Sequence, residues 1–244
     1  MKTSIFESIF NYNNSFSNYG LEHFIIFLAL TLFGFYLIYI AKTKWNEKQQ
    51  KLFITLLCAF AAFTQLAKIP IKIYLGDFDA AADLPFHLCN IMPFALIYAM
   101  WKKDRKFFGI IFFWIMTGTF QSLITTTLSE SLPNYESIRY WAVHGLISIA
   151  ALYGVAVYGY RLTYKDAINS IIAIHFLAGA VFLVNMALNA NYMFLNAKPE
   201  VTTMFDLLGP YPWYLLGMEP LAVILFGLIL VPFYVLKCKS VTRK

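Results

Sequence analysis

Long apolar runs fill most of this sequence, and they limit its possible folds more than any other feature. They fall at residues 24–41, 52–75, 86–101, 107–128, 140–160, 167–188 and 211–236. A helix needs about 20 mostly apolar residues to cross the hydrocarbon core of a bilayer. Backbone groups there must pair within the chain, and these runs are too continuous for barrel strands of alternating polarity. The sequence therefore predicts an all-α fold, a polytopic membrane helix bundle with about seven transmembrane helices.

The connections between the runs are short, so they leave no room for a second, soluble domain. We expect a polar extracellular N-terminal segment at 1–21, a single transmembrane helical domain at 22–236 and a basic cytoplasmic tail at 237–244. The first twenty residues lack the basic-then-apolar order of a signal peptide, so the first apolar run should remain in the mature protein. The polar segment at 1–21 is compatible with a lid over the extracellular end of the helix bundle or with disorder.

The basic residues predict how the bundle is oriented. Of the 19 lysines and arginines, 14 follow the first, third, fifth and seventh runs, whereas most acidic residues lie in the other connections. Cytoplasmic loops carry the excess of Lys and Arg, so the N-terminus is predicted outside and the C-terminus in the cytoplasm. The net charge of +6 is thus explained by topology, and a nucleic-acid partner is not expected. The pattern specifies no oligomeric state.

Polar residues inside the runs gather in the predicted outer half. A charge at the bilayer centre costs about 2.5–3.5 kcal/mol on insertion scales, so these residues need partners or a function. Their convergence from several runs predicts a water-accessible cavity between helices. The alternative is a set of scattered hydrogen bonds between helices, each of small energy. The main ones are Gln65, Lys68, His87, Cys89, Asn90, Gln121, His144 and Glu219.

The stretch from Asp83 to Asn90 is the most informative. Pro85 fits the first turn of a helix with Asp83 or Leu84 as its cap, which places Cys89 near a helix N-terminus. The helix dipole there favours a thiolate, so Cys89 is a candidate nucleophile. A lone thiol in a membrane helix is also a common small apolar filler. His87 is two residues away and points to another face, so His144 is our candidate general base, with His87 nearby.

Two lysines and one glutamate within the runs carry further expectations. Lys68 and Lys72 share a helix face, and Glu219 is expected to pair with Lys68 or to form another buried ion pair. Lys68 is alternatively a ligand for lipid phosphate, and Lys72 is expected to extend toward the interface.

The sequence predicts no metal and no cofactor. The cysteines Cys58, Cys89 and Cys238 are far apart, and they form no motif with a second cysteine or a histidine at metal-binding or redox spacing.

Two motifs resemble a known family. They are the Leu84-Pro-Phe-His-Leu-Cys-Asn stretch and the segment from Asn191 to Tyr214, which includes Asn191-Tyr-Met-Phe-Leu-Asn-Ala-Lys-Pro and Gly209-Pro-Tyr-Pro-Trp. They resemble the YwaF-like family of bacterial integral membrane proteins, which implies a multi-pass protein of the bacterial cell membrane. That family looks related to a eukaryotic transmembrane acyltransferase that builds ether-linked phospholipids through a cysteine, which would correspond to Cys89. A more remote relation is to membrane hydrolases of fatty-acid esters that use a threonine, for which Thr64 is a candidate.

Our leading hypothesis is a membrane-embedded acyltransferase or lipid-ester hydrolase that acts near the outer leaflet on a phospholipid or fatty-acyl substrate. Cys89 would attack the ester, His144 would move the proton and amides would stabilise the oxyanion. The rival hypothesis is a non-catalytic membrane protein, either a small transporter with a polar intramembrane cavity or an assembly factor. The candidate substrate-binding residues are Asn90, Gln121, Lys68, Asn191, Tyr192, Lys198, Arg139 and Glu219.

Overall fold

The computed structural model describes residues 9, 14–199 and 204–241, and side chains only to residue 235 at the C-terminal end. Throughout this part of the chain the regular secondary structure is helical, apart from one isolated bridge between Ser15 and Glu130. This confirms the predicted all-α fold. The helices are α2 (Leu21–Lys44), α3 (Glu47–Leu75), α4 (Leu88–Lys102), α5 (Arg105–Trp114), the π-helix η1 (Ile115–Thr119), α6 (Gln121–Ile124), α7 (Tyr135–Ala156), α8 (Tyr164–Leu188), the 3-10 helices η2 (Tyr192–Phe194) and η3 (Met204–Leu208), and α9 (Trp213–Val241).

Each apolar run of the sequence contains one membrane helix. Six helical segments in the described residues are long and apolar enough to cross a bilayer, and α5, η1 and α6 together form one of them. The seventh, α4, is apolar but has only 15 residues. The protein is therefore a multi-pass membrane protein, whose described residues contain six helices long enough to span a bilayer and the shorter apolar helix α4.

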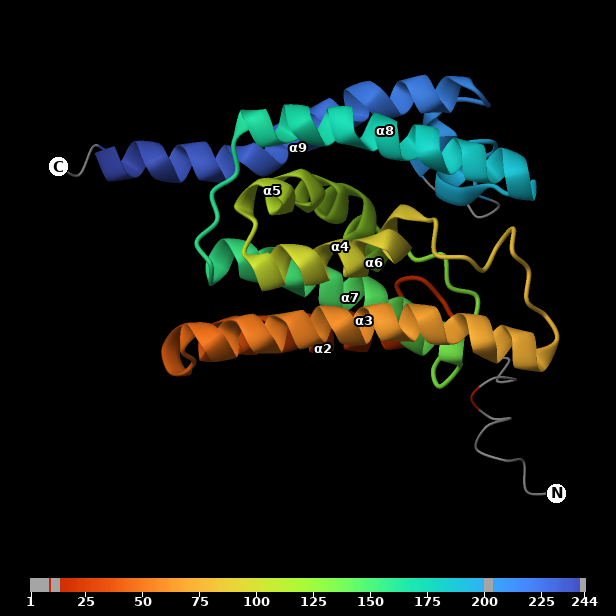
Figure 1. Ribbon diagram of the computed structural model, residues 1–244, viewed down its shortest axis with the longest axis horizontal. Coiled ribbons are helices and arrows are strands. Elements are labelled where there is room, and N and C mark those ends of the chain that lie inside the picture. The colour runs from red at the N-terminus through yellow and green to blue at the C-terminus, as the bar shows by residue number, and fades with distance from the viewer. Residues whose placement is uncertain (1–8, 10–13, 200–203, 242–244) are drawn as a thin grey trace.

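The helices form three layers (Figure 1). α2 and α3 make one outer layer, α8 and α9 make the other, and α4 to α7 lie between them. The loops that hold Asp83, Glu130 and Asp206 lie together at the end that the charge count predicts to be outside, called the outer end here. α2 starts and α9 finishes at opposite ends of the bundle, as seven crossings require.

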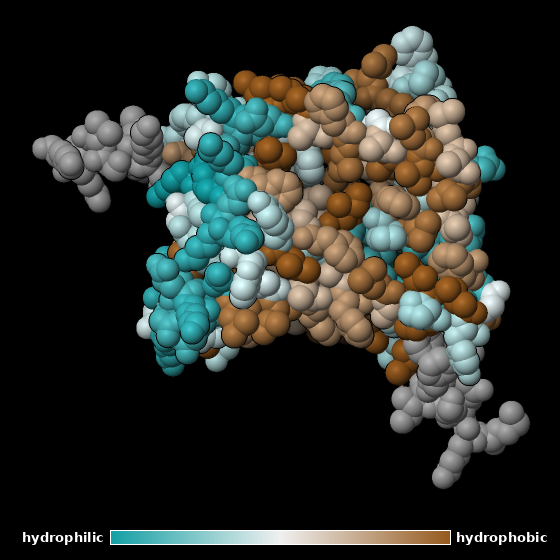
Figure 2. Space-filling view, viewed as in Figure 1, coloured by the Kyte–Doolittle hydropathy of each residue, from teal (hydrophilic) through white to brown (hydrophobic). Residues whose placement is uncertain are grey.

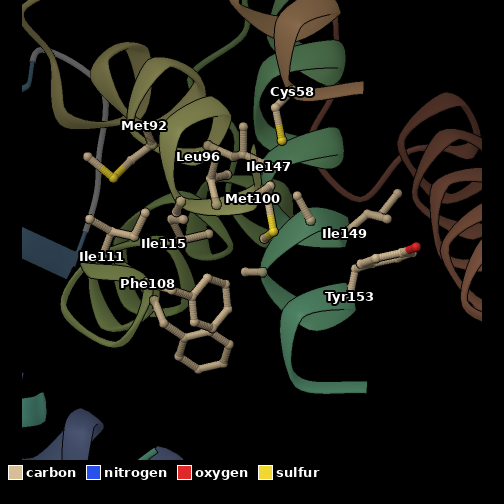
Figure 3. Close-up of a cluster of buried hydrophobic side chains, with 14 of the residues drawn as sticks. Cys58, Met92, Leu96, Met100, Phe108, Ile111, Ile115, Ile147, Ile149 and Tyr153 are labelled. Carbon is tan, nitrogen blue, oxygen red and sulfur yellow. The ribbon is translucent and has the colours of Figure 1, made fainter. Parts of the chain in front are cut away.

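The middle layer supplies most of the core. Figure 3 shows side chains of α3, α4, α5 and α7 packed together, including Cys58, Met92 and Ile147, all of which are buried. Cys58 is therefore a packing residue, as small thiols in cores usually are. Figure 2 shows hydrophilic side chains concentrated at the left, basic end, with a mostly hydrophobic surface beyond them. Such a band is the surface that a bilayer requires.

The short helix α4 shapes the outer end. Its 15 residues rise about 22 Å, less than the hydrocarbon thickness of about 30 Å. The loop at 76–87 therefore folds back from the end of α3 into the bundle before α4 begins (Figure 1). Irregular backbone is tolerated at membrane depth only where protein or water satisfies its polar groups. Polar side chains of neighbouring elements do so here.

The predicted start of this helix was wrong by about three residues. The N-cap of α4 is His87, without a capping hydrogen bond from its side chain, and Pro85 lies in the preceding loop. Asp83 does not act as a cap because its carboxylate binds the backbone N–H of Asp79 and two lysines of α3. Cys89 is nevertheless the second residue of the helix, so the expectation that it lies near a helix N-terminus is confirmed.

The N-terminal segment contacts the outer end. The backbone N–H of Phe16 donates to Ser129 and that of Ser131 donates to Asn14, and the Asn18 side chain bonds Thr126 through both backbone groups. Residues 14–20 thus cover the loop that follows α6. Residues 1–8 and 10–13 of the expected segment lie outside the described part. Of the expected tail, residues 242–244 also lie outside the described part, while residues 237–241 continue α9.

Candidate functional site

A network of charged side chains lies at the outer end between α3, α7 and the loop at 76–87. Lys68 and Lys72 both bind Oδ1 of Asp83, at 2.8 and 3.0 Å, and the Asp83 side chain is 2% exposed. Lys68 also lies 4.0 Å from Glu136, which binds Arg139 at 2.6 Å. With three cations and two anions, this outer charge network carries a net positive charge. We define it as Lys68, Lys72, Asp83, Glu136 and Arg139.

The network corrects two expectations about the lysines. Lys68 pairs with Asp83 rather than with Glu219, because the inward fold of the loop brings the carboxylate onto α3. Lys72, expected to extend toward the interface, binds the same carboxylate. Burial alone would raise the pKa of Asp83, but the Asp79 N–H and the two ammonium groups outweigh it and hold that pKa below its ordinary range.

Gln65 extends the network toward the helix core. Its Oε1 accepts a hydrogen bond of 2.6 Å from Nη1 of Arg139, while Nε2 is buried and has no partner in the described part of the chain. Gln65, Lys68 and Lys72 lie three and four residues apart, so they share one face of α3. That spacing was visible in the sequence, but the partners of these residues were not.

Cys89 lies beside this network in a partly buried position. Its thiol donates a hydrogen bond of 3.5 Å to Oδ1 of Asn90, and no histidine of the described residues hydrogen-bonds it. The charge of Arg139 acts on Cys89, and Cys89 in turn lies within electrostatic range of Tyr140. The predicted nucleophile therefore lies within electrostatic range of one residue of the charge network, Arg139.

His144 is fully packed within α7, and its tautomer follows from its contacts. Nδ1 lies 2.9 Å from the Tyr140 carbonyl, which can only accept, so Nδ1 carries the proton. Nε2 then has a free lone pair and no hydrogen-bond partner among the described residues. The Tyr140 ring lies against the imidazole with centroids 4.0 Å apart, and its hydroxyl donates to the Ser122 carbonyl at 2.7 Å. Tyr140 thus holds His144 in an orientation suited to accepting a proton.

His87 has the opposite tautomer. The backbone N–H of Met193 donates to its Nδ1 at 3.3 Å, so the ring proton is on Nε2. Its ring contacts those of Tyr192 and Phe194. His87 therefore accepts this hydrogen bond as a neutral imidazole, and it joins α4 to the segment after α8.

The predicted residues after α8 anchor loops. The Tyr192 hydroxyl donates to Ala80 at 2.7 Å and accepts from the N–H of Leu84 at 3.0 Å. Asn191 binds backbone groups of its own loop, and Lys198 pairs with Asp206 at 3.0 Å. The Tyr192 contacts fix the loop at 76–87 in front of α4, whereas Asn191 and Lys198 hold the segment after α8.

Two other predicted residues lie away from the network. The carboxylate of Glu219 is 3.2 Å from Nε2 of His175, with side chains 48% and 57% exposed. The expectation of a buried pair with Lys68 was wrong, because the first turns of α9 lie beside α8 rather than beside α3. Gln121 begins α6 and is partly exposed, and none of the described hydrogen bonds involves its side chain.

A pocket of about 260 Å³ opens on the side of the bundle between the start of α2 and α6. It is mostly apolar and is backed by His23, whose ring lies 5.5 Å from that of Trp141, the residue after Tyr140. The pocket therefore lies close to α7, the helix that carries His144. Across the described residues, no group of three or more His, Cys, Asp or Glu side chains is arranged to hold a metal ion.

The comparisons with known proteins identify the family. A sequence model of the TMEM164 family matches residues 18–230. The match covers most of the chain and every membrane helix at least in part, so the chain belongs to the TMEM164 family. No curated protein and no solved structure matches it.

Proposed function

We propose that this member of the TMEM164 family is a membrane-embedded acyl-transfer enzyme that acts on lipid esters near the outer leaflet. Cys89 is the nucleophile and His144 the general base. The observation that carries the proposal is the free Nε2 of His144, since the Tyr140 carbonyl fixes the proton on Nδ1. A neutral histidine in this tautomer can accept the proton of a thiol, which is the role of the base in nucleophilic catalysis.

The reaction follows from these groups. The thiol turns from Asn90 and gives its proton to Nε2 of His144, and sulfur attacks the ester carbonyl carbon. A carbon–sulfur bond forms, and the carbonyl electron pair moves to oxygen. When the carbonyl re-forms, the ester carbon–oxygen bond breaks, and the leaving alcohol oxygen takes the proton from His144. A second alcohol then receives the acyl group from the thioester, or water does in hydrolysis.

The outer charge network supports binding of a lipid head group. Its net positive charge and the unused N–H groups of Lys68 and Arg139 suit the oxygens of a phosphate. The apolar pocket beside α2 suits an acyl chain. We propose membrane phospholipids or fatty-acyl lipids as the substrate class and the bacterial cell membrane as the location.

The resemblance stated above agrees with this proposal. The YwaF-like family looks related to a eukaryotic acyltransferase that acts through a cysteine, and that cysteine would correspond to Cys89. Thr64, the candidate from the more remote hydrolases, has its hydroxyl bonded to the Ala61 carbonyl, so Cys89 is the better nucleophile.

The test is covalent labelling of the purified protein in lipid nanodiscs with a long-chain, activated fatty-acyl ester. Adducts are located by mass spectrometry, and the rate is compared among the wild type, Cys89→Ala and His144→Asn. The asparagine amide keeps a donor for the Tyr140 carbonyl, so folding should be preserved while the base is lost. We expect a thioester on Cys89, none in Cys89→Ala, and labelling about 10²-fold slower or more in His144→Asn.

Cys58 is the matched control, because its thiol lies in the core with no exposed surface. Cys58→Ala should label at the wild-type rate. Equal labelling of the wild type and Cys89→Ala would refute the proposal, and solute binding and transport would then be the functions to assay.

A further inference from the structure

Gln65 holds an amide donor that nothing in the described protein uses. The side chain is 1% exposed, and its oxygen accepts the 2.6 Å hydrogen bond from Arg139. Because a guanidinium can only donate, this contact fixes which amide atom is oxygen. The NH₂ group therefore points away from Arg139, buried and unpaired. An unsatisfied buried donor of this kind costs about 1–3 kcal/mol and is rare in folded proteins.

The surroundings of Gln65 hold its side chain in place. The preceding residue, Thr64, accepts a hydrogen bond of 2.6 Å at its carbonyl from the Tyr135 hydroxyl. Arg139 is held by two bonds to Glu136, at 2.9 and 2.6 Å. Arg139 also acts electrostatically on Cys89 and His144. The free donor thus belongs to a side chain held by Arg139, a cation within electrostatic range of both proposed catalytic groups.

The other amides expected to stabilise an oxyanion are less suitable. The oxygen of Asn90 accepts from the Cys89 thiol, and Asn191 binds its own loop. Gln121 lies on α6, with no contact that orients it in the described residues. Buried hydroxyls without partners, such as that of Thr119, rotate freely about their C–O bonds, whereas the NH₂ group of Gln65 has one orientation.

We propose that the Nε2 group of Gln65 donates to the carbonyl oxygen of the acyl ester. This inference rests on the proposed function and adds a catalytic donor to it. As sulfur bonds to the carbonyl carbon, the electron pair displaced onto oxygen is stabilised by the N–H of Gln65. When the carbonyl re-forms, the pair returns and the leaving alcohol departs. A preoriented donor of this kind costs no reorganisation during the reaction.

The experiment uses two reagents on the same thiol. The activated fatty-acyl ester reacts through a carbonyl oxyanion, whereas iodoacetamide alkylates sulfur by displacement and develops no such charge. Both rates are measured at Cys89 in nanodiscs for the wild type, Gln65→Met and Gln65→Glu. Gln65→Met keeps the volume without a donor, and Gln65→Glu keeps an acceptor for Arg139 and should fold even if the methionine variant does not.

We expect acylation to be about 10²–10³-fold slower in both variants, the range found when one oxyanion donor is removed. Alkylation should change by less than about threefold in Gln65→Met. Equal slowing of both reactions would show that Gln65 only supports the local structure, and wild-type acylation rates would show that it donates nothing. Either outcome overturns this inference but leaves the proposed function intact, because that function fails only if acylation does not depend on Cys89.

Discussion

Asp83→Asn should destabilise the protein more than any other single change in the outer charge network. At an effective dielectric constant of about 20, each contact near 3 Å has a Coulomb energy of about 5 kcal/mol before the cost of desolvation. Removing one partner from a buried ion pair costs about 3–5 kcal/mol. Here the substitution leaves two lysines on one helix face without their carboxylate, and the Lys68 side chain is only 11% exposed.

The assay is thermal unfolding of the protein in detergent. Its readout is the fraction of the protein that remains monodisperse after heating. At about 2–4 °C per kcal/mol for a chain of this size, the midpoint should fall by about 6–20 °C. Lys68→Met should cost less, because Asp83 keeps Lys72. The double variant should recover part of the Asp83→Asn loss, since only Lys72, whose side chain is 27% exposed, remains unpaired.

The matched control is Glu47→Gln, which removes a contact of 3.2 Å with Lys103 where the carboxylate side chain is 87% exposed. Exposed pairs contribute about 0–1 kcal/mol, so its midpoint should hardly move. Similar shifts for the Asp83 and Glu47 variants would refute the argument from burial. A double variant less stable than Asp83→Asn alone would also contradict it.

Two further predictions concern the loop at 76–87. Because the folded pKa of Asp83 lies below its ordinary value of about 3.8, its stabilisation is present above that pH and is lost as the pH falls through the lower, folded value. The unfolding midpoints of the wild type and Asp83→Asn should therefore begin to converge as the pH falls below about 3.8 and should meet below the folded pKa. A gap that stays constant as the pH falls through this range would contradict the assignment. Tyr192→Phe removes the partner of the Leu84 N–H and should lower the free energy of unfolding by about 1–3 kcal/mol. Amide hydrogen exchange at residues 80–84 should become faster. The control is Tyr98→Phe, where the tyrosine is 50% exposed, and it should leave exchange at 80–84 unchanged.

Periodicity and length were sufficient to predict the membrane helices but not their ends. All seven runs contain helices because lipid admits no other backbone structure for such continuous apolar stretches. The start of α4 was misplaced because Pro85 fits a first turn equally well as a loop residue, and the choice depends on Asp83 binding lysines of another helix. The π-helix η1 was not predicted either, since one extra residue in a helical turn leaves no mark on an apolar pattern.

The same limit applies to the candidate site. The sequence indicated Lys68, Cys89 and His144 because polar residues in apolar runs are costly wherever they lie. It gave no sign of Asp83 as the partner of Lys68, and it offered Asn90, Gln121 and Asn191 as oxyanion donors but not Gln65. Which amide is free depends on hydrogen bonds between α3 and α7, which are far apart in sequence.

The shortness of α4 connects these observations. A helix of full length would carry its N-terminus, and Cys89 with it, to the membrane surface among mobile head groups. Because α4 begins lower, the loop at 76–87 must enter the bundle, and its polar groups need partners there. Asp83 finds Lys68 and Lys72, the backbone of Leu84 finds Tyr192, and His87 finds the Met193 N–H. The groups that make the buried loop tolerable are therefore the ones that build the outer charge network and hold the start of α4, the helix that carries Cys89. A substitution that loosens the loop should change the reactivity of Cys89 without touching it.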